Sequence, residues 1–200
     1  VAGADVDDAH GTSEDFSYST LVLKRSGGTL LQHGIFGQGD IRWGRARFYG
    51  GLRHQFTGQG DTFLSPNGGA TVGLGQFRLR ASGYRSFRAP TLNELYRDFR
   101  VGNALTQANP GLIPEQLVGV ETGADWIGEN THVSVTLFRD ELTHLIGNAT
   151  LSTSPSLILR QRRNLSDGWS RGVETSVIHK WRQWTADASY LFADARLSTG

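Results

Sequence analysis

The sequence contains no cysteine, and this absence removes several classes of function. A chain without thiols has no disulfide framework, no zinc–thiolate site and no thiol nucleophile. The histidines are scattered along the chain without a close pair at metal-ligand spacing: His10, His33, His54, His132, His144 and His179. We therefore expect no metal site, and the sequence indicates no cofactor.

An excess of charge of one sign and long apolar runs are lacking too. The net charge is +1 with 20% charged residues, so no basic field points to nucleic acid as a partner. No apolar run approaches the roughly 18 residues that a membrane helix needs. A membrane β-strand needs only an alternation of lipid-facing and lumen-facing side chains, so the mean hydropathy of −0.34 fits a soluble or a membrane β-protein.

Methionine is absent and the chain starts at Val1, so we expect a processed product or an internal piece of a longer protein. The 26 glycines, only 5 prolines and 10% aromatic residues favour β-structure with many tight turns over disorder. Lys24 and Lys180 are the only lysines among 20 basic residues. The arginines that remain suit planar contacts to carboxylate and phosphate, although codon usage explains them equally well.

Alternation of side chains with a period of two predicts an all-β chain of nine strand segments and no helix. These segments are 1–8, 29–43, 46–57, 63–74, 76–88, 116–126, 131–146, 158–181 and 185–197. Short turns are expected near 44, 75, 128 and 183, and mostly longer loops at 9–28, 58–62, 90–114 and 147–157. Short connections at one end and long ones at the other are typical of an antiparallel up-and-down meander.

Four tryptophans lie at the short-turn edge of this meander: Trp43, Trp126, Trp181 and Trp184. Aromatic residues gathered at one edge are expected of a membrane-interface girdle. The alternative is that they plug the end of a soluble barrel, and alternation alone does not separate the two.

The polar face of the meander carries many charges, namely Asp40, Arg47, Arg53, Arg78, Arg80, Glu121, Asp125 and Asp187. In the core of a small soluble barrel, such charges would need partners or water that the core does not provide. In a wide lumen, either wet or filled by a polar domain, they are natural. The sequence therefore favours a large barrel.

One stretch matches a catalytic motif. Gly168 to Gly172 reads G-x-S-x-G, the pattern of a nucleophile elbow, which needs a strand, a sharp turn and a helix. Here the residues that follow, VETSVIHKW, alternate with period two and indicate a strand. We therefore interpret the match at Ser170 as chance and expect no enzyme.

The longest stretch without simple alternation is Phe87 to Glu115, and it contains the most specific motifs. The segments GYRSFRAPTLNELYR (83–97) and NPGLIPEQLVGVETGADW (109–126) resemble a TonB-dependent outer-membrane receptor. GIFGQGDIRW (34–43), with an extra glycine at Gly39, and RNLSDGWSRGVETS (163–176) agree with the same family. Ile113 departs from the family, which commonly has a basic residue there.

This resemblance implies part of a large transmembrane β-barrel of the roughly 22-stranded type with a plugged lumen. Residues 1–200 would be a single segment of that barrel, with the plug domain and the terminal strands outside it. The implied location is the bacterial outer membrane, with the short turns facing the periplasm. The implied function is active uptake of an iron–siderophore complex, cobalamin or a similar large, scarce ligand.

The partners that the resemblance implies are the plug of the same parent chain, the TonB–ExbB–ExbD complex, outer-membrane lipid, and a ferric chelate or cobalamin ligand. Residues near the mouth of the lumen would meet the ligand or the plug: Arg85, Arg88, Asn93, Glu94, Tyr96 and Arg97. Arginine there would suit an anionic chelate. The alternative is that these residues only order the loop and the strand ends.

Two other functions stay open at this point. A passive porin-like channel would share the barrel but lack a plug in the parent protein. A soluble β-barrel or β-sandwich binding module would fold as a monodisperse monomer without detergent, whereas a barrel segment would expose apolar strands and open edges.

Overall fold

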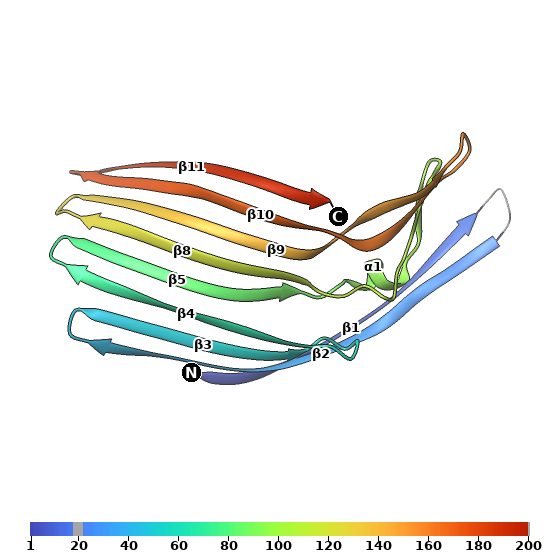
Figure 1. Cartoon of the computed structure of the whole chain (residues 1–200), viewed down its shortest axis with the longest axis horizontal. Helices are drawn as coiled ribbons and strands as arrows, with labels where there is room; N and C mark the ends of the chain where they lie inside the picture. Colours follow the sequence, from blue (N-terminus) through green and yellow to red (C-terminus); the bar gives the residue numbers. More distant parts are fainter. Residues whose placement is uncertain (18–21, 200) are drawn as a thin grey trace.

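A computed structural model describes residues 1–17 and 22–199 and shows one large curled sheet (Figure 1). All nine predicted strand segments are strands, and two further short strands bring the sheet to 11. The strands are β1 Ala2–Ser17, β2 Val22–Trp43, β3 Ala46–Phe56, β4 Thr62–Leu74, β5 Phe77–Arg88, β6 Phe99–Val101, β7 Ala104–Gln107, β8 Glu115–Ile127, β9 Thr131–Thr153, β10 Ile158–Trp181 and β11 Trp184–Thr199. The predicted all-β class is confirmed.

The long strands follow one another in an antiparallel meander, in the order β1-β2-β3-β4-β5-β8-β9-β10, with β11 on the far edge of β10. The short turns gather at one end of the sheet, on the left in Figure 1, and the long connections lie at the other. One pairing departs from the meander, because β7 runs parallel to the first four residues of β10, Ile158–Gln161. The predicted up-and-down layout holds for the long strands and fails for β6 and β7.

Two predicted loops are shorter than expected. The prediction of a loop over 9–28 is wrong for most of its length, because β1 continues to Ser17, β2 begins at Val22, and the pairing continues unbroken between them. Residues 18–21 of that predicted loop lie outside the described residues. The loop predicted from residue 147 begins only after Thr153. Backbone pairing extends these strands past the point where side-chain alternation stops, because ladder hydrogen bonds do not need an apolar face.

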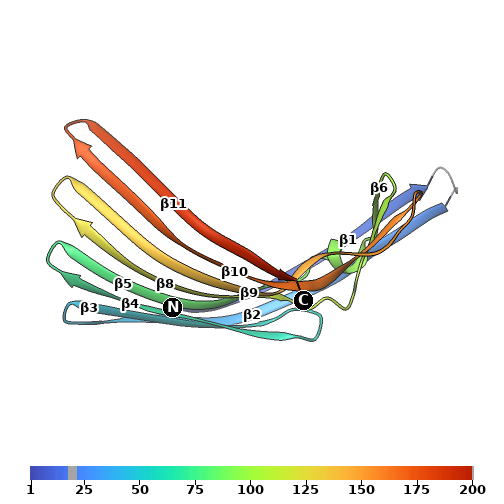
Figure 2. The ribbon, with the colours of Figure 1, turned by 45° about the horizontal axis from the view of Figure 1, so that its top comes forward.

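The sheet curls into an open half-barrel, and the strand register assigns its two faces (Figure 2). One row of paired residues crosses nearly the whole convex face: Ile41, Phe48, Ala70, Ala81, Thr122, Leu137, Val173 and Phe192. Ile41, Phe48, Leu137 and Phe192 of this row are exposed, Ile41 at 66%, and Val173 is half-buried. A continuous exposed apolar surface of this kind is unlike that of a soluble monomer.

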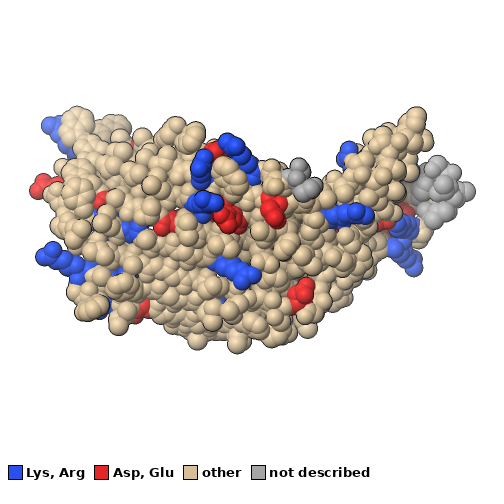
Figure 3. Space-filling view, viewed as in Figure 1, with Lys and Arg blue, Asp and Glu red and all other residues tan. Residues whose placement is uncertain are grey.

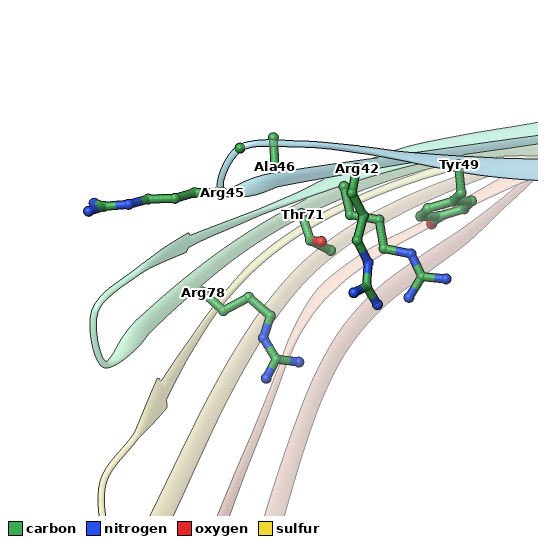
Figure 4. Close-up of a pocket in the computed structure, with 8 residues that line it drawn as sticks. Arg42, Arg45, Ala46, Tyr49, Thr71 and Arg78 are labelled. Carbon is green, nitrogen blue, oxygen red and sulfur yellow. The ribbon is translucent and has the colours of Figure 1, made fainter.

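The concave face carries charge, as predicted from the alternation. Figure 4 shows Arg42, Tyr49 and Arg78 pointing into the hollow of the curve, whereas Ala46 points away from it. Two other arginines of this face are paired with carboxylates: Arg47 binds Asp40 at 3.0 Å and Arg53 binds Asp5 at 2.7 Å. The pairs satisfy the requirement that charge enclosed by a fold has a partner.

Within the described part of the chain, no helix has the length and apolar character needed to cross a membrane.

Candidate functional site

The connection between β5 and β8, here called the excursion (residues 90–114), folds onto the concave side of the sheet at its long-loop end. It contains a one-turn helix, α1 Leu92–Tyr96, and the small hairpin β6–β7. The prediction of no helix is therefore wrong for α1. Its sequence signal is the pattern Thr-x-x-Glu at 91–94, a capping box directly after Pro90.

The capping box forms as that pattern requires. The Thr91 hydroxyl accepts from the backbone N–H of Glu94 at 3.3 Å, and the Glu94 carboxylate accepts from the backbone N–H of Thr91 at 2.8 Å. A single helical turn is unstable alone, since nucleation fixes several residues for one hydrogen bond. Caps and tertiary packing must therefore hold α1 in place.

The packing comes from a small hydrophobic core beneath the excursion. Leu95 of α1 is fully buried, together with Leu30 of β2 and Leu112 at the exit of the excursion. Leu92, Tyr96 and Ile146 pack against these three residues. Because β2 and β9, which carry Leu30 and Ile146, are not neighbours in the sheet, the excursion joins distant strands across the hollow.

Glycines on β1 and β2 make room for α1. A Cβ atom at Gly28 would collide with the ring of Tyr96, and one at Gly11 would touch Leu92 at 3.6 Å. Gly11 and Gly28 are direct partners in the β1–β2 ladder. The Gly-rich sequence that suggested a loop is therefore a flat platform for the helix.

A three-residue ion-pair network anchors the entry and exit of the excursion. Arg88, the last residue of β5, donates from Nε to Glu115 at 2.7 Å and from Nη1 and Nη2 to the two oxygens of Glu94 at 3.0 and 3.2 Å. Glu115 also accepts from the backbone N–H of Ile146 at 2.7 Å. Bidentate arginine–carboxylate pairs of this kind are directional, so the network orders the helix against the strand ends.

The electrostatics of the excursion keep its carboxylates ionised. Burial by itself would raise the pKa of Glu94, but hydrogen bonds from Arg88 and Thr91 outweigh it and lower the pKa below its ordinary value. Burial would likewise raise the pKa of Asp98, but hydrogen bonds from Lys24 and from the backbone N–H of Ala108 lower it. Both side chains therefore carry negative charge at neutral pH.

Asn93 and Arg97 take no part in this network. Nη2 of Arg97 lies 3.7 Å from the carboxylate of Asp15, and its Nε is buried without a hydrogen-bond partner among the described residues. The backbone carbonyls of Asn93 and Arg97 accept hydrogen bonds from Arg162 of β10. Arg97 is the candidate with the most unused hydrogen-bonding capacity.

Arg162 is a residue of this site that the sequence prediction missed. Besides holding the two carbonyls of α1, its guanidinium lies 5.1 Å from the ring centre of Phe99. The available signal was the cluster Arg160, Arg162 and Arg163. Nothing in the sequence indicated that Arg162 would reach back over more than sixty residues to the excursion.

Arg85 stands apart from the other predicted residues. It is paired with Val118 in the β5–β8 ladder and donates to Gln116 at 2.6 Å, on the convex face of the sheet. Arg88, three residues on, is paired with Glu115 and faces the concave side. The structure thus brings Arg88, Asn93, Glu94, Tyr96 and Arg97 together and separates Arg85 from them by the thickness of the sheet.

The described residues include no group of three or more histidine, aspartate or glutamate side chains arranged to hold a metal ion. Ser170 lies in the middle of β10, where it is paired with Asp140 and Ala195. A nucleophile elbow needs a strand-to-helix turn, so the local geometry agrees with a chance match.

Solved structures share this fold over nearly the whole chain. A siderophore receptor, PirA from Pseudomonas aeruginosa, is 15% identical with a TM-score of 0.73, and the match covers 99% of this chain and 46% of that one. The copper transporter OprC is 17% identical with a TM-score of 0.74, covering 98% of this chain and 35% of that one. The chain therefore spans less than half the length of these proteins.

The FrpB iron transporter from Neisseria meningitidis is 16% identical with a TM-score of 0.63, and the match covers 87% of this chain and 26% of that one. No curated protein matches the chain. The model of a protein family described as "TonB dependent receptor-like, beta-barrel" matches residues 2–200. This is a family of receptors and not of enzymes, and the chain, with its apolar convex face and charged concave face, belongs to it.

Proposed function

We propose that residues 1–200 form a segment of the barrel of a TonB-dependent outer-membrane transporter. The observation that carries this proposal is the division of the curled sheet into two faces, one apolar and exposed and the other charged, within a chain that matches the family over residues 2–200. An apolar exterior suits lipid, and a charged interior suits a water-filled or plugged lumen.

The proposed cargo is an iron–siderophore complex, with cobalamin or another large scarce ligand as the alternative. Solved structures that share the fold include one named as a siderophore receptor and one named as a copper transporter, in line with cargo that contains a metal. The partners that follow are a plug domain of the parent protein, the TonB–ExbB–ExbD complex that energises it, and outer-membrane lipid around the barrel.

We propose that the ligand or the plug contacts α1 on the concave side of the sheet. Arg88 and Glu94 are already bound to each other, so their role is to hold the helix at the strand ends. Asn93 of that fixed helix and Arg97 at its C-terminal end then present their side chains, and Arg97 supplies the positive charge that an anionic chelate needs. Tyr96 supports them from below, because its ring packs on Gly28 and the hydrophobic core. Arg85, on the convex face, is not part of this contact.

Uptake by cells carrying the intact parent gene tests the proposal. Cells that lack other iron receptors are given radioactive iron bound to a siderophore, with and without the gene and with and without TonB. We expect uptake that requires both. Uptake that needs the gene but persists without TonB would indicate a passive channel, and equal uptake without the gene for every siderophore and for cobalamin would overturn the proposed function.

A further inference from the structure

A second cluster of charged residues lies on the convex face, where the sheet is otherwise apolar. It is here called the convex patch and consists of two paired rows across β9, β10 and β11. The rows are Arg139, Arg171 and Asp194, and next to them Glu141, Trp169 and Arg196. Figure 3 shows charged side chains gathered over these strands on a face that is mostly uncharged. The strand register brings all six residues to one level of the sheet.

The convex patch lies at the border of the apolar surface that is nearer the long-loop end of the sheet. Toward the short turns, the convex positions of these strands carry no lysine, arginine, aspartate or glutamate. They are Thr131, Val133, Val135 and Leu137 on β9, Val173, Thr175, Val177 and His179 on β10, and Ala186, Ala188, Tyr190 and Phe192 on β11. From Trp181 at the short turn to Arg171, β10 rises about 33 Å at ~3.3 Å per residue. With the usual strand tilt of about 40°, that spans an apolar band of about 25 Å, the height of a membrane barrel.

The convex patch has more positive than negative charge. Arg139 binds Glu141 at 2.8 Å, but Arg171 and Arg196 share the single carboxylate of Asp194, at 3.5 and 3.4 Å. Three guanidiniums thus face two carboxylates. The side chains of Arg171 and Arg196 are 62% and 68% exposed, so both remain accessible to a ligand. An anion could bind there without breaking the existing pairs.

Trp169 contacts both of these arginines. The guanidinium carbons of Arg171 and Arg196 lie 5.0 and 5.4 Å from its ring centre. Tryptophan concentrates at the level of lipid head groups, where its ring is apolar and its N–H is wet. Both guanidiniums are within cation–π distance of this one ring, which keeps two positive charges at the same place on the convex face.

An open depression of about 850 Å³ connects the charged rows to the apolar band. Leu137, Val173 and Phe192 line it on the apolar side. Three arginines and one carboxylate line it on the charged side, namely Arg139, Arg171, Asp194 and Arg196. A surface that is cationic at one end and apolar at the other is complementary to an anionic amphiphile.

We propose that the convex patch binds the phosphate-bearing head group of a membrane lipid, whose acyl chains lie along Leu137, Val173 and Phe192. This inference rests on the proposed function, because it requires the convex face to contact the bilayer. Basic clusters at the membrane border recognise anionic head groups through charge and through bidentate arginine–phosphate pairs. The two exposed arginines over Trp169 supply both.

Native mass spectrometry of the intact receptor in detergent tests the inference, with dioleoylphosphatidic acid and dioleoylphosphatidylcholine as probes. The double variant Arg171→Gln/Arg196→Gln is compared with Arg160→Gln/Arg163→Gln, which removes the same charge from the same strand beyond the apolar band. We expect wild type and the control to retain phosphatidic acid preferentially. The Arg171/Arg196 variant should bind it about 10- to 30-fold more weakly.

Inorganic phosphate, added as a competitor, separates a lipid site from a simple anion site. We expect no displacement of phosphatidic acid by millimolar phosphate, and displacement would overturn the lipid assignment. Equal retention of the two lipids, or wild-type retention by the Arg171/Arg196 variant, would overturn the inference altogether. TonB-dependent uptake by cells that carry the same receptor variants separates the proposals, because absence of lipid selectivity with normal uptake refutes only the convex patch.

Discussion

Arg88 and Glu115 join the last residue of β5 to the first residue of β8 through a hydrogen bond of 2.7 Å. They are also the terminal pair of the β5–β8 ladder. Because Glu115 accepts the backbone N–H of Ile146 of β9 as well, one carboxylate ties together three strands at the point where the excursion leaves and re-enters the sheet. Predictions about the stability of the excursion follow from this link.

Removing the Glu115 carboxylate should loosen the excursion. In Glu115→Ala, Arg88 loses one of its two acidic partners and the N–H of Ile146 is left unpaired, at a cost of about 1–3 kcal/mol. Hydrogen exchange of the intact receptor should show faster exchange at Ile146 and in α1. The control is Glu14→Ala, whose exposed pair with Arg25 should contribute less than about 1 kcal/mol. Unchanged exchange in Glu115→Ala would contradict the anchoring role.

Removing the helix cap should act on α1 alone. Thr91→Ala deletes the hydroxyl that accepts the N–H of Glu94 and should destabilise the helix by about 1 kcal/mol. Limited proteolysis should cut faster between residues 92 and 97. Thr91→Ser keeps the hydroxyl and should behave as wild type, and equal cleavage rates in Thr91→Ala and Thr91→Ser would argue against the cap.

Adding one methyl group to the platform should displace the helix. Gly28→Ala places a Cβ atom against the ring of Tyr96, so α1 must shift away from β2. Gly37→Ala on the same strand is the matched control, because no atom lies within 4 Å of its added Cβ. We expect faster proteolysis of the excursion in Gly28→Ala only. Equal behaviour of the two variants would contradict the close contact between α1 and β2.

Acid should release the excursion only far below neutrality. Burial would raise the pKa of Asp98, but hydrogen bonds from Lys24 and the N–H of Ala108 lower it overall. A carboxyl group with a lowered folded pKa contributes stability above its unfolded pKa of about 3.9 and loses it as the pH falls through the folded value. Proteolysis of the excursion should therefore be constant from about pH 7 to 5 and rise below about pH 4.

The variant Asp98→Asn provides the control for that pH series. It should be cleaved faster already at neutral pH and should show a flatter dependence on acid, because the titrating carboxyl is gone. Opening of the wild-type excursion between about pH 6 and 5 would point to a histidine instead.

Arginines on opposite faces of the sheet should differ in transport. Arg97→Ala removes a charge at the end of α1, on the concave side of the sheet. If the cargo is anionic, the intact receptor should bind it about tenfold more weakly. Arg85→Ala removes the same charge from the convex face and should leave affinity and uptake unchanged. Equal effects of the two substitutions would refute the proposal that the ligand binds on the concave side of the sheet.

Much of the fold was predictable because strand alternation is a local signal. The period-two pattern located all nine long strands and assigned Arg78, Asp125 and their neighbours to the polar face. The pattern failed where β1 and β2 continue without an apolar side, in the Gly-rich stretches that carry Gly11 and Gly28. Those glycines make room for Leu92 and Tyr96 of α1, which lies more than sixty residues away along the chain.

For the candidate site, the sequence predicted the segment of chain but not the contacts between its residues. The motif at 83–97 pointed to the correct segment, and the register then separated Arg85 from Arg88. The sequence did not show that Arg88 is engaged by Glu94 and Glu115, or that Arg162 binds the carbonyls of Asn93 and Arg97. These contacts depend on how the excursion folds back, which no local pattern encodes.

By itself, the sequence determined the strand periodicity, the two faces of the sheet and the family, because each is carried by neighbouring residues along the chain. Only the tertiary structure decided which charged residues meet. Arg88 meets Glu115 across a ladder, and Arg171 of β10 meets Asp194 of β11 because the two residues are partners in the strand register. Register is set by backbone hydrogen bonds between strands, so the pairing of distant side chains becomes known only when the sheet is assembled.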